Sequence, residues 1–171
     1  MNKRHIAFIG MTSSGKTTIG EEFARSRNLK FIDTDRSIEE LEGNKLIEIL
    51  KDKGRDYLQY KERDLLMEID DAQGVHVISP GGSVIYDDGS MAWMSNNCLI
   101  IFIDTPISII KDRLEKQPKA IFGLVNGDID ALYKERIPLY KKYADATIAS
   151  NGRSLEEMVR DAGEIVNKFL F

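Results

Sequence analysis

The feature that most constrains this chain is a phosphate-binding loop, or P-loop, close to its first residue. Residues 10–17 read Gly-Met-Thr-Ser-Ser-Gly-Lys-Thr and directly follow a short apolar run at residues 6–9. The pattern uses glycines so that backbone N–H groups can turn inward around a polyphosphate, a lysine to reach the outer phosphates, and a hydroxyl to hold Mg²⁺. A helix beginning at Thr17 would aim its positive N-terminal end at the same phosphates. A plain strand–helix turn is the weaker alternative, because strand, spacing, lysine and hydroxyl all agree.

Composition limits the other function classes. The chain has 171 residues, of which 42% are hydrophobic and 30% are charged, so one domain spanning residues 1–171 is expected. The formal net charge of −4 offers no general attraction to nucleic acid or to an anionic membrane. We therefore expect a small-molecule substrate, with no nucleic-acid or membrane partner, and a monomeric protein.

Cysteine and histidine usage indicates a reducing compartment and no zinc site. The single cysteine, Cys98, excludes an internal disulfide and lies in an apolar run, where a buried and inert thiol is expected. His5 and His76 have no second histidine or cysteine at ligand spacing, so both are expected to be structural or surface residues. No signal peptide and no long apolar segment are recognisable, and a cytoplasmic location is expected.

Apolar runs and helical periodicity alternate along the chain, which predicts an α/β fold with a parallel sheet. Strands are predicted at Arg4–Ile9, Lys30–Ile32, Val75–Ser79, Asn97–Ile103 and Ala146–Ala149. Helices are predicted at Thr17–Arg27, Arg36–Glu42, Leu46–Lys53, Tyr57–Ala72, Pro106–Lys116, Ile129–Tyr143 and Leu155–Phe169. In such sheets ligands bind beyond the carboxyl ends of the strands, where the P-loop also lies.

Three further clusters could carry chemistry near that edge. Asp33 and Asp35 follow a predicted strand, so one carboxylate could face Mg²⁺ and the other an acceptor hydroxyl. Asp35 could equally cap the next helix. Residues 81–82 are paired glycines that permit close backbone approach to a ligand, although a plain turn is the alternative. Arg136 could clamp an anionic group, although most helix arginines are only solvated.

Together and in this order, these elements resemble the shikimate kinases, small P-loop phosphotransferases of the nucleoside-monophosphate-kinase type. That family has a Phe-x-Asp-x-Asp element after the P-loop, a triple-glycine loop after the third strand, and an Arg-x-Pro-Leu-Tyr helix. This chain has matching residues at 31–35, 81–82 and 136–140. The resemblance implies a three-layer P-loop kinase fold with a five-stranded parallel sheet flanked by helices, and it implies ATP and Mg²⁺ as cofactors.

The resemblance also implies roles for individual residues. Thr17 and Asp33 would hold Mg²⁺, while Lys16, Asp35 and Lys119 would be catalytic. Asp35, Gln59, Gly81, Gly82 and Arg136 would contact the substrate. The nucleotide would be bound by Gly10, Thr12, Ser13, Ser14, Gly15, Lys16, Thr17, Thr18, Arg113 and Arg153. A helical region at about residues 34–72 would bind the substrate, and residues 117–128, which include the most loop-like interior stretch, would form a lid.

The chain departs from the family pattern on the acceptor side. Where the family has Gly-Glu-x-x-Phe-Arg-x-x-Glu, residues 54–62 read Gly-Arg-Asp-Tyr-Leu-Gln-Tyr-Lys-Glu, so the substrate-gripping arginine is Gln59. Ser83 replaces the third loop glycine, and Gln117 stands at the lid position of an arginine, with Lys119 nearby. Arg55 or Lys61 could restore the missing charge, but neither occupies the matching position.

The leading hypothesis is an ATP-dependent kinase that converts shikimate to shikimate 3-phosphate. A related kinase with a different small hydroxylated acceptor is the first alternative. A nucleotide-binding module without turnover is the second alternative, and the retained Asp35 and Arg136 argue against it.

Overall fold

The computed structural model describes residues 3–119, 121–124 and 126–170. Residues 120 and 125, which belong to the expected lid, therefore lie outside the described part of the chain. No helix within that part is long and apolar enough to cross a membrane.

A five-stranded sheet forms the centre of the molecule, and every strand pair in it is parallel. The strand order is β2-β3-β1-β4-β5. The strands are β1 (His5–Ile9), β2 (Lys30–Asp33), β3 (His76–Ser79), β4 (Cys98–Asp104) and β5 (Ala146–Ala149). The central strands β1, β3 and β4 are almost wholly buried, as continuous apolar runs predict for strands covered on both faces. The predicted α/β fold with five parallel strands is confirmed.

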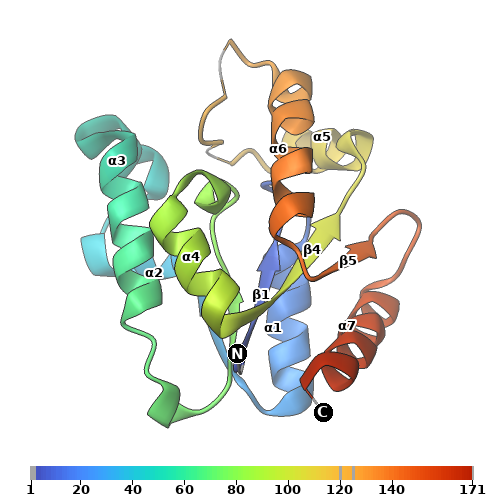
Figure 1. The fold of residues 1–171 in the computed structure, drawn as a ribbon. Coiled ribbons are helices and arrows are strands. Elements are labelled where there is room, and N and C mark those ends of the chain that lie inside the picture. The colour runs from blue at the N-terminus through green and yellow to red at the C-terminus, as the bar shows by residue number, and fades with distance from the viewer. Residues whose placement is uncertain (1–2, 120, 125, 171) are drawn as a thin grey trace.

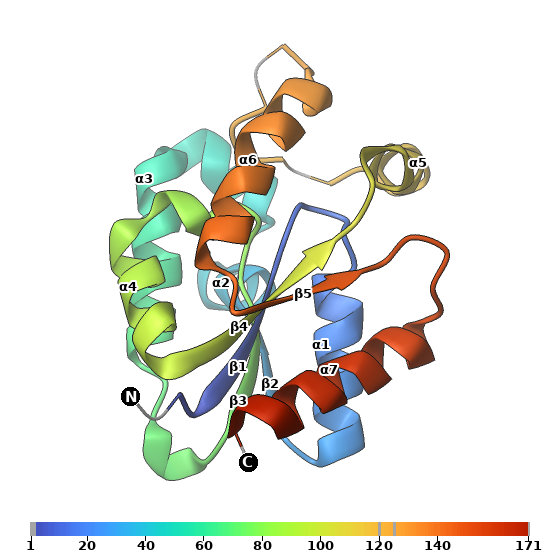
Figure 2. The same ribbon diagram turned by 45° about the vertical axis from the view of Figure 1, so that its right-hand side comes forward.

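Helices cover both faces of the sheet and complete the three layers (Figures 1 and 2). The helices are α1 (Lys16–Arg27), α2 (Thr34–Glu42), α3 (Leu46–Met67), α4 (Asp88–Asn97), α5 (Ile107–Lys116), α6 (Ile129–Tyr143) and α7 (Leu155–Leu170), with short 3₁₀ turns η1 (Asp71–Gln73) and η2 (Val84–Tyr86). Side chains of α1 and α7 pack on one face, and side chains of α3, α4 and α6 pack on the other. A third apolar cluster joins α2 to α3 outside the sheet.

Two helix predictions were wrong. Helix α4 was missed because its sequence, which contains glycine, serine and two asparagines, has low helix propensity. It forms because the Asp87 carboxylate accepts the Ser90 amide at its start, and because Met91 and Met94 are buried in the core. The helix predicted to reach Ala72 ends at Met67. The predicted break between residues 53 and 57 is present as a kink at Gly54, where φ is 80°.

The histidines and the cysteine are buried and structural, as expected. The two histidines, which are far apart in the sequence, contact each other in the fold. His5 and His76 lie on neighbouring strands with ring centroids 5.3 Å apart, and the His76 amide donates to His5 Nδ1. Cys98 is fully buried at the start of β4, and burial raises the pKa of its thiol. Such a thiol is unreactive.

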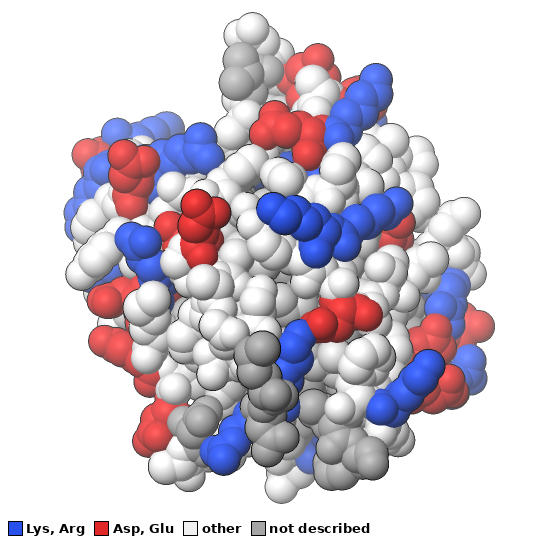
Figure 3. Space-filling view, viewed as in Figure 1, with Lys and Arg blue, Asp and Glu red and all other residues white. Residues whose placement is uncertain are grey.

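The carboxyl ends of the strands share one edge, and the topology gathers the functional segments there. Asp33 at the end of β2 pairs in register with Ser79 at the end of β3, and β1 leads directly into residues 10–15. The described residues between α5 and α6 lie above the same edge in Figure 1. On the face drawn in Figure 3, positive and negative side chains are interspersed rather than gathered by sign.

Candidate active site

The P-loop turns between β1 and α1 in a conformation that requires its glycines. Gly10 has φ 150°, and a Cβ there would lie 2.9 Å from the carbonyl oxygen of Ile103. Gly15, at φ 103°, occupies the cap position of α1. Lys16 is buried and its Nζ donates to the Met11 carbonyl at 3.2 Å. Burial lowers the pKa of Lys16, although Asp35 and Asp33 oppose that effect.

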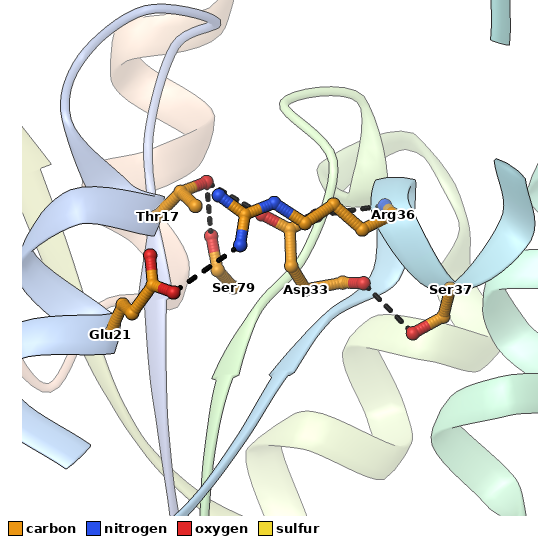
Figure 4. Close-up of polar contacts among 6 residues, drawn as sticks. All are labelled: Thr17, Glu21, Asp33, Arg36, Ser37 and Ser79. Atoms are coloured by element: carbon orange, nitrogen blue, oxygen red, sulfur yellow. Dashed lines mark hydrogen bonds and ion pairs between the residues drawn. The ribbon is translucent and has the colours of Figure 1, made fainter. Parts of the chain in front are cut away.

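A hydroxyl and a carboxylate beside the P-loop form a pair suited to Mg²⁺ (Figure 4). Thr17 Oγ1 donates to Asp33 Oδ2 at 2.7 Å and lies 3.4 Å from Ser79 Oγ. The described residues contain no group of three or more His, Cys, Asp or Glu side chains that could together hold a metal ion. Mg²⁺ does not need one, because it is usually held by one or two protein oxygens together with phosphates and water. The donor set of Thr17 and Asp33 therefore fits the ion.

Asp33 also decides between the two interpretations of Asp35. The other oxygen of Asp33, Oδ1, accepts the Arg36 amide at 3.0 Å, so Asp33 is the N-cap of α2. Asp35 lies in the first turn of that helix. The capping alternative for Asp35 is therefore wrong, and its carboxyl group is left for another role.

Next to the P-loop is a cavity whose walls carry an excess of positive charge. It is lined by Thr12, Ser13, Ser14, Gly15, Lys16, Thr17, Thr18, Ile19, Asp35, Arg113, Lys116, Gln117, Lys119, Arg153, Leu155 and Met158. Every predicted nucleotide-binding residue except Gly10 is in this set, and Gly10 shapes the turn behind it. Arg113 also donates to the Ser13 carbonyl at 2.9 Å, whereas Arg153 is paired with Asp161 at 2.6 Å.

A second cavity lies on the other side of Asp35, towards α3. It is lined by Thr12, Asp35, Ile38, Leu46, Leu50, Leu58, Gln59, Glu62, Gly81, Gly82, Ser83 and Phe122. Asp35, Gln59, Gly81 and Gly82, which were predicted to contact the substrate, thus lie together. Thr12 and Asp35 line both cavities, so the two meet at these residues.

Two carboxyl groups in the second cavity have perturbed acidity. Burial raises the pKa of Asp35 to about 6, against the opposing attraction of Lys16. Burial and the nearby Asp35 raise the pKa of Glu62 to about 7. A Cβ added at Gly81 would lie 2.9 Å from Asp35 Oδ1 and 3.2 Å from Glu62 Oε1, so only glycine fits between the two groups.

Glu62 is the site residue that sequence reasoning missed. Its Oε1 accepts the Thr34 hydroxyl at 2.6 Å and the Gly81 amide at 2.7 Å, so it ties α2 and the glycine loop to α3. The available signal was its position between Leu58 and Leu66, because residues four apart share a helix face and that face is apolar. An acidic residue in an apolar stripe is rarely buried without a specific partner.

Arg136 is fully buried behind the glycine loop, and one of its hydrogen-bond donor atoms has no partner among the described residues. Its Nη2 donates to the Phe122 carbonyl and its Nε to the Tyr86 hydroxyl at 3.3 Å, while Nη1 has no partner among the described residues. A Cβ at Gly82 would lie 3.4 Å from that Nη1. The unpaired donor therefore points towards the glycine loop at the edge of the second cavity.

Comparison with known proteins gives the family. A sequence model of the family described as shikimate kinase matches residues 12–167. The chain belongs to the shikimate kinase family. A shikimate kinase of Clostridium botulinum (strain Eklund 17B / Type B) is 38% identical over 164 residues, covering 96% of this chain and 98% of the relative. A shikimate kinase of Aromatoleum aromaticum is 28% identical over 167 residues, covering 96% and 95%.

Solved structures agree with the fold of this shikimate kinase family member. The shikimate kinase of Aquifex aeolicus superposes with a TM-score of 0.77 at 26% identity, covering 96% of each chain. The shikimate kinase of Acinetobacter baumannii in complex with shikimate has a TM-score of 0.84 at 21% identity, covering 96% of this chain and 93% of the other. At that identity the second likeness supports the fold alone.

Two of the three departures from the shikimate kinase pattern lie at the second cavity, whereas Gln117 lines the first. Gln59 and Ser83 are both among the residues that line the second cavity. Lys119 lines the first cavity together with residues of the P-loop. Lys61 lies 3.7 Å from Glu42, and this ion pair holds it towards α2 rather than towards the cavity.

Proposed function

We propose that this chain is an ATP- and Mg²⁺-dependent kinase that transfers the γ-phosphoryl group to a hydroxyl of shikimate, giving shikimate 3-phosphate. The observation that carries the proposal is the meeting of two cavities at Asp35 and Thr12. One cavity has the P-loop and its cations, and the other has the carboxyl groups and glycines suited to a hydroxylated acid. A phosphoryl group can pass directly between ligands in the two.

The residues at that junction support the chemistry of phosphoryl transfer, which depends on positioning and charge stabilisation. Mg²⁺ bound by Thr17 and Asp33 would neutralise phosphate charge. Lys16, next to that pair, would stabilise the migrating group, as would Lys119 from the segment over the cavity. Asp35, with its pKa raised to about 6, is ionised at neutral pH yet basic enough to accept the proton of the acceptor hydroxyl.

Different residues would recognise the hydroxyl groups and the carboxylate group of the acceptor. Asp35 can accept hydrogen bonds from acceptor hydroxyls, and the loop at Gly81 and Gly82 allows the ring to approach the backbone. The unpaired Nη1 of Arg136 offers a charge-assisted hydrogen bond to a carboxylate. We further propose one monomeric domain in the cytoplasm, with residues 34–72 as the substrate-binding region and residues 117–128 as a lid that excludes water.

A coupled ADP-release assay with shikimate, other hydroxy acids, cyclitols and sugars tests the proposal. We expect turnover that requires Mg²⁺ and is fastest with shikimate. Lys16→Met should lower kcat by at least about 10²–10³, the usual effect of removing a preorganised charge stabiliser. Faster turnover of another acceptor would replace shikimate as the substrate, and near-normal activity of Lys16→Met would refute the role of the P-loop.

A further inference from the structure

Arg55 lies one helical turn before Gln59. Gln59 stands at the position where the family pattern has the arginine that binds the substrate. Helix α3 resumes at Arg55 after the kink at Gly54, so residues 55 and 59 are four apart in regular helix and share a face. Gln59 lines the second cavity, which the proposed function makes the acceptor cavity. The family pattern has glutamate and arginine at these two positions, and this chain has arginine and glutamine. The positive charge has therefore moved by one turn along the same face.

The Arg55 side chain is directed towards the rim of the acceptor cavity. Its guanidinium carbon lies 5.0 Å from the ring centroid of Phe122 and 5.1 Å from that of Tyr86. Phe122 lines the cavity. A cation–π contact engages none of the guanidinium N–H groups in a conventional hydrogen bond, so these donors remain able to bind an anion.

Arg136 shares the same two neighbours. Its guanidinium carbon lies 5.2 Å from the Tyr86 centroid, and its Nη2 donates to the Phe122 carbonyl. Two guanidinium groups thus approach the rim of the cavity from α3 and α6. Like charges gathered in this way repel each other, and an anion between them removes the repulsion.

Three of the five cations of α3 lie close to an acidic side chain, whereas Arg55 and Lys51 have no acidic partner among the described residues. Lys53 and Lys61 pair with Glu42, and Arg63 lies 3.4 Å from Asp87. Within the described residues, no ion pair or hydrogen bond engages Arg55, whose side chain is exposed. Its charge is therefore available to a ligand.

We propose that Arg55 binds the carboxylate of the acceptor together with Arg136, in place of the arginine that the family pattern has at the position of Gln59. This assignment rests on the proposed function. It makes Arg55 a determinant of specificity for anionic acceptors, and it accounts for the loss of arginine at residue 59 without loss of a second positive charge.

Steady-state kinetics of Arg55→Gln with shikimate and with its neutral carboxamide tests the assignment. A charge-assisted hydrogen bond is worth about 1.5–3 kcal/mol, so the KM for shikimate should rise about tenfold or more, with little change in the KM for ATP. The KM for the carboxamide should not change. Lys51→Gln is the matched control, because it removes an exposed positive charge four residues earlier, before the kink at Gly54, and should alter the KM for shikimate by less than about twofold. The double substitution Arg55→Gln with Gln59→Arg should restore the KM for shikimate.

The outcomes separate this assignment from the function on which it rests. If the unmodified enzyme phosphorylates shikimate and Arg55→Gln has the same KM, the assignment is overturned and the function stands. An equal rise in KM for shikimate and the carboxamide would show that Arg55 only supports the aromatic rim, and would also overturn it. If the unmodified enzyme neither binds nor phosphorylates shikimate, the proposed function and the assignment both fail.

Discussion

Replacing Glu62 by glutamine should raise the free energy of unfolding above that of the unmodified chain at neutral pH. At acid pH the two proteins should have similar free energies of unfolding. Glu62 is 5% exposed and accepts hydrogen bonds from the Thr34 hydroxyl and the Gly81 amide through one oxygen. Glutamine has a carbonyl oxygen of similar placement that can accept both bonds. The substitution therefore removes a titratable group and leaves the local contacts in place.

The size of the effect follows from the two states of the carboxyl group. Its ordinary pKa of 4.5 applies in the unfolded chain, and burial together with Asp35 raises the pKa to about 7 in the folded protein. Between these values the folded protein retains a proton that the unfolded chain releases, so the free energy of unfolding falls as pH rises through this window. At about 1.4 kcal/mol per pH unit, the fall due to Glu62 is about 3 kcal/mol.

Urea denaturation of the ligand-free protein between pH 4.5 and pH 8 measures this difference. The unfolding free energies of Glu62→Gln and the unmodified chain should be similar at the acid end and should separate by about 3 kcal/mol at the neutral end. Glu48→Gln, an exposed substitution on the same helix, is the control and should follow the unmodified profile. Parallel profiles for Glu62→Gln and the unmodified protein would show that Glu62 is not held protonated by its surroundings.

Asp35→Asn should raise the free energy of unfolding of the ligand-free protein at neutral pH, by about 3 kcal/mol, because it removes a buried carboxyl group whose pKa is raised from 3.8 to about 6. It should nevertheless lower kcat by about 10²–10⁴, because an amide cannot accept the acceptor proton; unchanged kcat would exclude Asp35 from the chemistry. Hydrogen exchange over residues 117–128 should slow when an ATP analogue and shikimate are both bound, because closure of the lid brings Lys119 onto the phosphates. Identical exchange with and without ligands would count against a lid.

Local sequence determined the nucleotide half of the site. The glycines, lysine and threonine of the P-loop act through one short turn whose backbone they themselves fix, as the φ of Gly10 and Gly15 illustrates. Alternation of apolar runs with helical periods likewise predicted the parallel sheet, because burial on both faces requires continuous apolar strands. The edge of the sheet at which the site lies followed from the parallel arrangement, because the carboxyl ends of parallel strands lie at the same edge.

Tertiary packing decided what the sequence left open. Helix α4, whose residues favour helix only weakly, forms because Met91 and Met94 are buried against the sheet. Asp33 and Asp35 are two residues apart and chemically alike in the sequence. In the folded chain Asp33 caps α2 and accepts a hydrogen bond from the Thr17 hydroxyl, whereas Asp35 lies between the two cavities.

The acceptor half of the site depended most on the tertiary structure. Glu62 acquires its partners from α2 and from the loop after β3, and Arg55 meets Tyr86 and Phe122, which are 31 and 67 residues further along the chain. No short pattern encodes such encounters, since they depend on how helices and loops distant in sequence are packed. The sequence by itself predicted a phosphate-binding site at this edge of the sheet, and the tertiary structure decided which carboxyl and guanidinium groups lie at or beside the second cavity.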